Sequence, residues 1–375
     1  MEYSTGRPTR AYIDLKALDH NLAVVRRIAG GRKVLGVVKA DAYGHGAVEV
    51  SRRLEWAGAD MLGVALVEEG FELRHAGIKS HILILGGVFD HQADDIVAAG
   101  LTPVVFTMTQ ARALSDAAVR RSMRLPVHFK VDTGMGRVGL PPEDAASFIR
   151  EVAGLPGIAP EGIMTHLADV GGQDITFAER QVDLFGGVLD RLAGFGIEFP
   201  LAHAAGSAAV MGFKPALFNM VRPGIMLYGC CESACVDEPV ELRPVMSVKT
   251  AIIHLKRMEA GVPISYGRTY HTKRPSLIAT LPIGYADGVS RGLTNKGHVL
   301  AGGKRCPVVG AVCMDMIMVD VTDVELVAVG DEAVFIGNQS GEAITAEDVA
   351  HTLGTISYEV LCGISKRVPR VYGPA

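Results

Sequence analysis

Four cationic or potentially cationic side chains stand at the ends of apolar segments that have the composition of buried strands. Lys39 follows the strand-like start of VVKADAYGHG (37–46), and Lys130 closes VHFK. His166 follows IMT, and Arg222 follows NMV. Taken singly, such a lysine is usually a stem that extends into water, and such a histidine is usually a hydrogen-bonded core residue. Four of them on one rim would repel one another, so their convergence predicts an anionic, phosphorylated ligand.

A lysine among other cations has a lowered pKa and becomes a usable amine nucleophile. Such an amine forms a Schiff base with a carbonyl cofactor, and pyridoxal 5'-phosphate is the leading candidate. Gly224 would let backbone N–H groups approach a phosphate, and the hydroxyls of Ser207 and Tyr43 could donate to it. The sequence therefore favours Schiff-base chemistry at Lys39.

The segment GMGRVG (134–139) matches the dinucleotide-binding pattern G-x-G-x-x-G, but its context differs. The next helix is expected only after Pro141, so the third glycine falls outside the first helical turn. The segment also belongs to the fifth strand–helix unit of the chain, whereas the dinucleotide pattern opens a βαβ array. We therefore expect no dinucleotide at this loop.

Metal chemistry has weak support. Cys230, Cys231 and Cys235 are clustered, but no histidine lies near them in the sequence, and none of the six cysteines forms a Cys-x-x-Cys pair. The chain also lacks a P-loop and a His-Glu-x-x-His motif. We expect reduced thiols and no metal.

The elements that must position these residues alternate between strand and helix. The expected strands lie near 34–38, 61–65, 82–85, 102–106, 127–131, 161–165, 200–204 and 220–223. The expected helices cover 46–57, 67–76, 90–98, 108–119, 142–153 and 174–194. This alternation over about 230 residues predicts a (β/α)8 TIM-type barrel, in which chemistry gathers at the carboxyl ends of the strands.

The pattern changes after Gly229. Segments rich in valine and isoleucine, separated by turn residues, continue from Leu242 to Ile336 and predict a mostly-β domain. A capping box that begins at Thr345 then predicts a short helix. We place the barrel at 1–235, the β domain at 236–375 and the linker near 232–240.

Composition narrows the class of protein. The 375 residues are 49% hydrophobic and 21% charged, with a net charge of −4, which predicts a globular enzyme of two domains and no nucleic-acid or membrane surface. The N-terminal MEYSTGRPTR lacks the apolar segment of a secretory signal, and no apolar run reaches membrane-spanning length. We expect a cytoplasmic protein.

The chain resembles the alanine racemase family along nearly its whole length. The matching segments are VVKADAYGHG, KVDTGMGRVG, MTHLAD, NMVRPGIMLYG, ISYG, IGYADGVSR, CMDM and YEVLCGISKRVPRVY, in this order. The resemblance implies a barrel plus β domain, a head-to-tail homodimer and a pyridoxal 5'-phosphate enzyme that interconverts L- and D-alanine by a two-base mechanism. It also implies D-alanine supply for bacterial peptidoglycan.

The resemblance assigns roles to individual residues. Lys39 would carry the cofactor as an aldimine and act as one base, and Tyr266 of the partner subunit would be the other. The phosphate would be held by Tyr43, Ser207, Gly224, Ile225 and Tyr358. Arg222 would face the pyridine nitrogen, and Arg137 with the backbone N–H of Met314 would bind the substrate carboxylate.

Two further residues serve this chemistry. We expect Arg222 and a hydrogen bond from His166 to favour the phenolate of Tyr266. In relatives, the lysine that corresponds to Lys130 is often carbamylated. A carbamate at Lys130 would orient Arg137. An unmodified lysine with an anion bound between it and Arg137 would also fit.

Two positions depart from the family pattern. Gly206 stands where many relatives have asparagine, and Ala311 stands where many have arginine, so substrate range is open. The alternatives are racemisation of serine or of several amino acids, a related decarboxylase, and a non-catalytic cofactor carrier. A decarboxylase would have an acidic residue in place of Arg222, and a carrier would not need the second domain.

Overall fold

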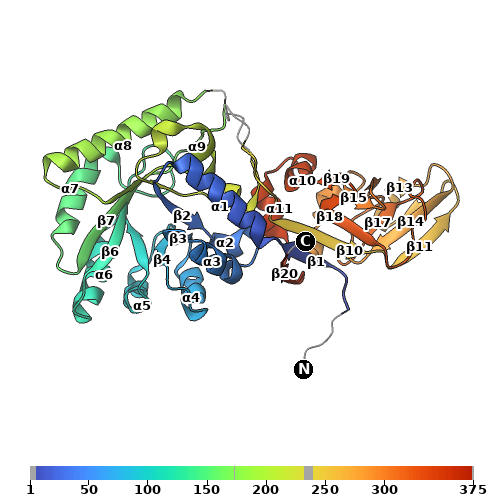
Figure 1. The fold of residues 1–375 in the computed structure, drawn as a ribbon, viewed down its shortest axis with the longest axis horizontal. Helices are drawn as coiled ribbons and strands as arrows, with labels where there is room; N and C mark the ends of the chain where they lie inside the picture. The colour runs from blue at the N-terminus through green and yellow to red at the C-terminus, as the bar shows by residue number, and fades with distance from the viewer. Residues whose placement is uncertain (1–5, 173, 232–239, 374–375) are drawn as a thin grey trace.

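The structure is a computed structural model that describes residues 6–172, 174–231 and 240–373. Within these residues the chain forms a barrel of parallel strands and, beside it, a domain built mainly of antiparallel strands (Figure 1). The fold class predicted from the sequence is confirmed. The expected linker at 232–240 lies almost entirely outside the described residues, and so does Cys235.

The barrel is an eight-stranded parallel sheet in the order β8-β7-β6-β5-β4-β3-β2-β9. Its strands are β2 (Lys33–Val37), β3 (Met61–Val64), β4 (His81–Ile84), β5 (Thr102–Val105), β6 (Leu125–Lys130), β7 (Ile158–Met164), β8 (Leu201–His203) and β9 (Met220–Val221). The barrel is nearly closed, because the backbone N–H of Asn219 donates to Ala202 over 3.2 Å and that of Arg222 donates to Ala205 over 2.9 Å. The strands are mostly apolar and mostly buried, as a sheet covered on both faces requires, with polar residues inside β6, β7 and β8.

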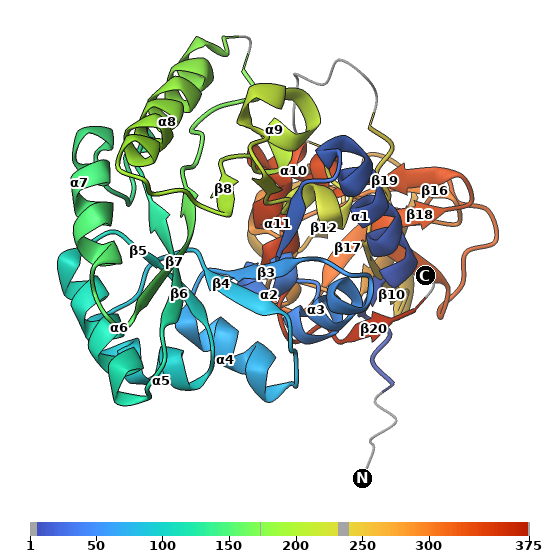
Figure 2. The same cartoon turned by 60° about the vertical axis from the view of Figure 1, so that its left-hand side comes forward.

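Helices cover the outside of the barrel (Figure 2). They are α1 (Leu15–Ala29), α3 (Ala47–Trp56), α4 (Val67–His75), α5 (Ala93–Ala98), α6 (Met108–Arg120), α7 (Pro142–Ala153), α8 (Thr176–Gly194) and α9 (Ser207–Gly212). Local sequence sets their ends. The carboxylate of Asp14 accepts the N–H groups of Lys16 and Ala17 at the start of α1, and Gly30, with a φ of 60°, ends it.

The turn directly after β2 has the opposite hand from every helix around it. This turn, α2 (Lys39–Tyr43), has φ values of 52 to 55° at residues 40–43, none of which is glycine. An L residue in this conformation costs about 1–2 kcal/mol. The sequence does not predict the turn, because none of its four left-handed residues is a glycine.

The second domain contains the remaining strands. They are β10 (Met246–Ala251), β11 (His254–Met258), β12 (Pro263–Ile264), β13 (Tyr270–His271), β14 (Ser276–Leu281), β15 (His298–Ala301), β16 (Lys304–Pro307), β17 (Ile317–Asp320), β18 (Glu332–Gln339), β19 (Glu342–Ile344) and β20 (Arg370–Tyr372). Two helices, α10 (Ala346–Leu353) and α11 (Ser357–Gly363), lie between this domain and the barrel (Figure 1). The predicted capping box of α10 is present, with Thr345 and Asp348 exchanging backbone-to-side-chain hydrogen bonds of 3.1 Å.

The N-terminal strand belongs to the sheet of the second domain. This strand, β1 (Arg10–Ile13), lies between β10, to which it is antiparallel, and β20, to which it is parallel. The sequence analysis did not predict it, because a run of four residues, RAYI, is too short to show a period. The first and last described strands of the chain are thus neighbours.

Membrane insertion through a helix has no support in the described residues. None of their helices is both long enough and apolar enough to span a bilayer.

Candidate active site

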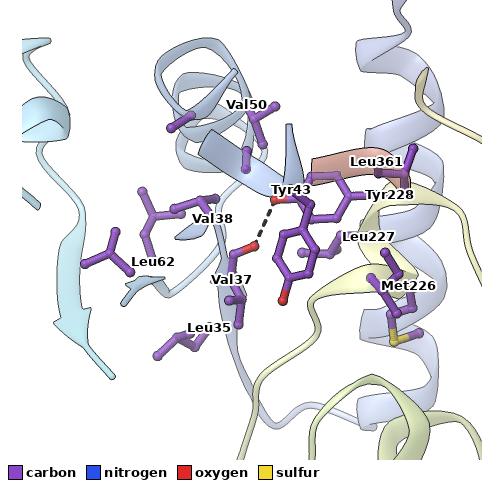
Figure 3. Close-up of a cluster of buried hydrophobic side chains, with 14 of the residues drawn as sticks. Leu35, Val37, Val38, Tyr43, Val50, Leu62, Met226, Leu227, Tyr228 and Leu361 are labelled. Carbon is purple, nitrogen blue, oxygen red and sulfur yellow. Dashed lines mark hydrogen bonds between the residues drawn. The ribbon is translucent and has the colours of Figure 1, made fainter. Parts of the chain in front are cut away.

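Lys39 is held at the end of β2 by backbone contacts that precede it. The backbone N–H of Val38 donates to the carbonyl of Gly63 over 2.8 Å. The hydroxyl of buried Tyr228 donates to the carbonyl of Val37, also over 2.8 Å, among the apolar side chains drawn in Figure 3. Because these groups are already bonded, the backbone that leads into Lys39 is held in place at the barrel rim.

The left-handed turn that follows Lys39 is braced from two elements. Glu69, in α4, accepts the backbone N–H of Ala40 over 2.7 Å with one carboxylate oxygen and that of Ala65 over 2.7 Å with the other. Arg370, in β20, donates to the carbonyl of Gly44 over 2.9 and 3.0 Å. These contacts offset the unfavourable conformation of the turn.

Arg222 is 4% exposed, and acceptors surround its guanidinium. One terminal nitrogen contacts Nδ1 of His203 at 3.0 Å. The other donates to the carbonyls of Thr165 and Ala204, both at 2.9 Å, and contacts Nδ1 of His166 at 3.2 Å. Burial lowers the pKa of Arg222 to about 9, which leaves the group protonated at neutral pH. The guanidinium is therefore a fixed positive charge beneath the rim.

Three of the four predicted cations, Lys39, Lys130 and Arg222, lie within electrostatic range of one another, and Arg137 joins them, whereas His166 is not charged. Burial, followed by the charges of Arg222 and Arg137, lowers the pKa of Lys130 to about 8. Burial, followed by the charge of Arg137, lowers the pKa of Lys39. This gathering of positive charge suits the site to an anion.

His166 is neutral at neutral pH. Burial, and then the charge of Arg222, lowers its pKa to about 3. A guanidinium cannot accept a hydrogen bond, so an Nδ1–H would face Arg222 without an acceptor, which favours the tautomer with the single ring proton on Nε2. His166 therefore offers an Nε2–H donor at the edge of the site.

Three of the predicted phosphate ligands meet beside α9. The hydroxyl of Ser207 accepts the backbone N–H of Gly224 over 2.9 Å and that of Met226 over 3.3 Å. A Cβ on Gly224 would lie 2.4 Å from the hydroxyl of Tyr43, so only glycine allows that close approach. The hydroxyls of Ser207 and Tyr43 therefore meet beside the backbone of Gly224, and hydroxyl groups gathered in this way can donate to a phosphate.

The remaining two predicted phosphate ligands line a cavity next to this region. The cavity has a volume of about 270 Å³, and His166, Ser207, Ile225 and Tyr358 are among its lining residues. The ring of Tyr358, in α11, lies 5.8 Å from that of Tyr43. The second domain thus contributes one wall of the site.

Arg137 is carried by a loop that folds around Asp132. One oxygen of the Asp132 carboxylate accepts the backbone N–H groups of Gly134 and Gly136 at 3.0 and 3.1 Å, and the other accepts that of Arg137 at 3.0 Å. These bonds occupy the amides that a dinucleotide loop would offer to a pyrophosphate. Helix α7 begins beyond Gly139, as expected.

Two predicted residues are not brought to the rim of the same chain. Tyr266 is 75% exposed and Met314 is 52% exposed, both in the second domain. Tyr266 opens a short helical turn, η4 (Tyr266–Arg268), just before β13. Figure 1 draws β13 at the end of the molecule farthest from the barrel.

The residues at the rim fit pyridoxal 5'-phosphate. They supply a half-buried amine with a lowered pKa, a fixed guanidinium, and two hydroxyl groups beside a glycine whose position leaves no room for a Cβ. A TIM-type barrel with this set of groups has the features of an enzyme that uses a phosphorylated carbonyl cofactor.

Comparison with known proteins identifies the family. Residues 13–232 match the alanine racemase N-terminal domain, and residues 245–372 match the alanine racemase C-terminal domain. Alanine racemase 2 of Caldanaerobacter subterraneus subsp. tengcongensis is 47% identical over 98% of this chain and 95% of its own. The alanine racemase of Geobacter sulfurreducens is 46% identical over 98% of this chain and 97% of its own.

Solved structures agree. The alanine racemase of Clostridium difficile 630 superposes with a TM-score of 0.94 at 40% identity, covering 99% of this chain and 97% of its own. The alanine racemase of Bacillus anthracis with bound L-Ala-P gives a TM-score of 0.92 at 34% identity, covering 99% and 96%. The chain belongs to the alanine racemase family. It is a pyridoxal-5'-phosphate-dependent isomerase, because the enzymes of this family are.

The sequence analysis missed several residues that hold the predicted ones in place. Glu69 and Asp132 anchor the loops of Lys39 and Arg137, and His203 contacts Arg222. One signal was present in β6, where His128 lies two residues before Lys130 and so shares its face of the strand; His128 in turn contacts His203.

Proposed function

We propose that this chain interconverts L- and D-alanine by moving the Cα proton between two bases on opposite faces of the substrate. Lys39 would be one base, and the partner subunit's Tyr266 would be the other. The observation that carries the proposal is the half-buried Lys39 directly after β2, where burial and the charge of Arg137 lower the pKa of its amine. When bound, pyridoxal 5'-phosphate withdraws electrons from Cα and so acidifies its proton.

The reaction can be tested directly. The protein, supplied with pyridoxal 5'-phosphate, is incubated with L-alanine in D₂O. We expect loss of optical rotation, exchange of the Cα proton for deuterium, and retention of the carboxylate. Loss of the carboxylate would indicate a decarboxylase, and an absorbance band of bound coenzyme without exchange would indicate a carrier.

Lys39 would hold the coenzyme through its amine and, once substrate has displaced it, take or return the proton on one face. A base needs a neutral amine, and the lowered pKa of Lys39 increases the neutral fraction at a given pH. The hydroxyls of Tyr43, Ser207 and Tyr358 and the backbone of Gly224 and Ile225 would hold the phosphate.

The second base would come from a head-to-tail homodimer. Tyr266 and Met314 are exposed on the second domain, where a partner chain could receive them. The neutral imidazole of His166 would donate its Nε2–H to the incoming phenol oxygen, and cationic Arg222 behind it would favour the phenolate.

Arg222 would face the pyridine nitrogen of the coenzyme. A guanidinium that is already bonded to Thr165, Ala204 and two histidines keeps its own protons. The ring nitrogen opposite it would therefore stay unprotonated and be a weaker electron acceptor, which disfavours side reactions such as transamination.

Lys130 would be carbamylated. The amine must be neutral to react with CO₂, and a pKa of about 8 provides a neutral fraction at physiological pH. The resulting anion would lie among Arg222, Arg137 and Lys39 and would orient Arg137, which with the backbone N–H of Met314 would bind the substrate carboxylate.

Substrate range is a separate question. Ala311 is 6% exposed, and its carbonyl accepts from the hydroxyl of Ser265 over 2.7 Å; Gly206 lines the cavity beside His166. Neither adds the charge or amide that many relatives have there. Comparing kcat/KM for alanine, serine and lysine tests the alternative of broader specificity. A cytoplasmic role in D-alanine supply for peptidoglycan fits this activity and would be tested by D-alanine auxotrophy on deletion.

A further inference from the structure

A line of buried polar side chains runs from Arg222 through the barrel interior. Arg222 contacts Nδ1 of His203 at 3.0 Å. Nε2 of His203 lies 2.8 Å from Nδ1 of His128, and Nε2 of His128 lies 3.2 Å from a carboxylate oxygen of Glu161. The two histidines are fully buried, whereas the side chain of Glu161 is 23% exposed. The line therefore connects the fixed cation of the site to a carboxylate near the barrel wall.

Two features of β7 create room for this line. The register between β6 and β7 shifts after Val127, which pairs with Pro160, while His128 pairs with Gly162. Glu161 is the extra residue of this bulge, and bulges redirect a side chain. A Cβ on Gly162 would lie 2.5 Å from the His128 ring, so the absence of a side chain there makes space for the imidazole.

The chemistry of the two ends fixes every proton in the line. A guanidinium only donates, so Nδ1 of His203 must accept and its Nε2 must carry the proton. That Nε2–H donates to Nδ1 of His128, which therefore carries its own proton on Nε2 and donates it to Glu161. An ionised carboxylate only accepts, so it selects the same order from the other end.

The reverse order would disrupt the site. If His128 carried its proton on Nδ1, it would donate to Nε2 of His203 and push the proton of His203 onto Nδ1. Two N–H groups, from His203 and Arg222, would then face each other at 3.0 Å. The guanidinium would have to turn away from its present position.

We propose that Glu161 is a positioning residue for the racemase reaction, in which it fixes the tautomers of His128 and His203 and thereby holds the Arg222 guanidinium in place. The link to the reaction rests on the proposed function of Arg222. The proton order itself does not depend on that function. Glu161 lies in the middle of β7 and is joined to Arg222 through three successive contacts, by way of His128 and His203.

The charges around the line are consistent with this order. Burial lowers the pKa of His128 and lowers that of His203 well below its usual value, so both rings are neutral at neutral pH. The hydrogen bond from His128 lowers the pKa of Glu161. The other titratable groups within electrostatic range are Arg222 and Lys130 from the site and His81 at the start of β4.

The first experiment needs no substitution. ¹⁵N NMR of the histidine-labelled, coenzyme-loaded protein reports which nitrogen of each imidazole is protonated. We expect Nε2–H tautomers for both His128 and His203, assigned by single substitutions. A proton on Nδ1 of His203, or a cationic ring, would overturn the proposal.

The second experiment replaces the carboxylate with an amide of the same size. Glu161→Gln can both donate to and accept from His128, so the order is no longer imposed from that end. We expect part of the molecules to adopt the reverse order, in which His128 carries its proton on Nδ1 and Arg222 turns away from His203. We also expect a fall in kcat of about tenfold with KM little changed, as for residues that orient metal ligands, and more transamination per racemisation event. Glu143→Gln, which removes an exposed carboxylate of the barrel, is the matched control and should change none of these.

The outcomes separate the two hypotheses. If Glu161→Gln leaves tautomers, kcat and partition unchanged, the positioning role is wrong. If the thermal stability alone falls, Glu161 is merely structural, which also contradicts the proposal. If the tautomers follow the expected order but the wild-type protein does not racemise alanine, the proposed function fails while the proton order stands.

Discussion

The barrel rim and the exposed face of the second domain contribute to the candidate site in opposite ways. At the rim, Arg222 is 4% exposed and its guanidinium is surrounded by acceptors from the same chain. On the second domain, Tyr266 is 75% exposed. Under the proposed function, one chain would complete the half of the site that holds the anionic coenzyme, and a partner chain would supply the other half.

This contrast predicts that the two halves respond differently to protein concentration. Groups buried in one chain are positioned by folding alone, so their geometry does not depend on protein concentration. A residue that works across a subunit contact is positioned only in the dimer. A substitution in either half should abolish activity. Mixing two inactive variants should restore activity only if the two substituted residues belong to different chains of the same site.

The largest expected effect is the loss and recovery of activity in mixed dimers. Lys39→Ala should reduce D-alanine formation by about 10⁴-fold or more, and Tyr266→Phe by about 10²–10⁴-fold. If the two residues act across the subunit contact, dissociating and re-pairing the two variants should restore about a quarter of wild-type activity, because half of the dimers would have one intact site of two. Mixtures that stay inactive would place both residues in one chain. Lys16→Ala, on the exposed surface, is the control for Lys39→Ala.

The next effect concerns the fixed charge beneath the rim. Arg222→Glu should slow racemisation by about 10²-fold, since it removes a preorganised charge, and should raise the share of turnovers that end in transamination. Formation of pyruvate and of the aminated coenzyme measures that share. Arg222→Lys retains the charge, so it should lose rate while its partition stays near that of the wild type. An unchanged partition in Arg222→Glu would contradict the assigned role.

A smaller effect concerns the protonation and carbamylation of Lys130 at the barrel rim. With a pKa of about 8, the neutral fraction of Lys130 rises about fivefold between pH 7 and pH 8. Carbamate formation consumes the neutral amine and CO₂ and releases a proton, so at constant dissolved CO₂ the carbamate signal in ¹³C NMR should rise more steeply with pH than the neutral fraction does, until Lys130 is fully modified. Lys130→Arg should abolish the signal. A signal that falls with rising pH would show that the amine is not the group modified.

The smallest effect tests the brace of the left-handed turn. Glu69→Ala leaves the backbone N–H groups of Ala40, Ala65 and Leu66 without their acceptor. The free energy of unfolding should fall by about 1–3 kcal/mol, as measured by denaturant titration. Glu68→Ala, which removes an exposed neighbour on the same helix, should change it by much less.

Sequence reasoning found the residues at strand ends and missed those inside strands. Lys39, Lys130 and His166 were predictable because the carboxyl ends of parallel strands meet on one rim. His128 and Glu161 were not, because a polar residue inside a strand can face either the interior or solvent. Its direction here depends on a bulge that no local pattern shows.

In the fold, too, local features could be predicted from the sequence and long-range contacts could not. The alternating elements of the barrel were predictable from apolar periodicity, and most helix ends were marked by glycine or a capping residue. The pairing of β1 with β10 and β20 was not, since it joins residues more than 200 positions apart. The left-handed turn at 40–43 depends on Glu69 and Arg370, which reach it from distant elements.

The adjacency of β1 and β20 has a consequence for biosynthesis. On the ribosome, β1 is made long before Arg370–Tyr372 and lacks its second neighbour until that strand has been synthesised. Arg370, which bonds the carbonyl of Gly44, belongs to the same late strand. The segment around Lys39 therefore reaches its finished form only after β20 has been made.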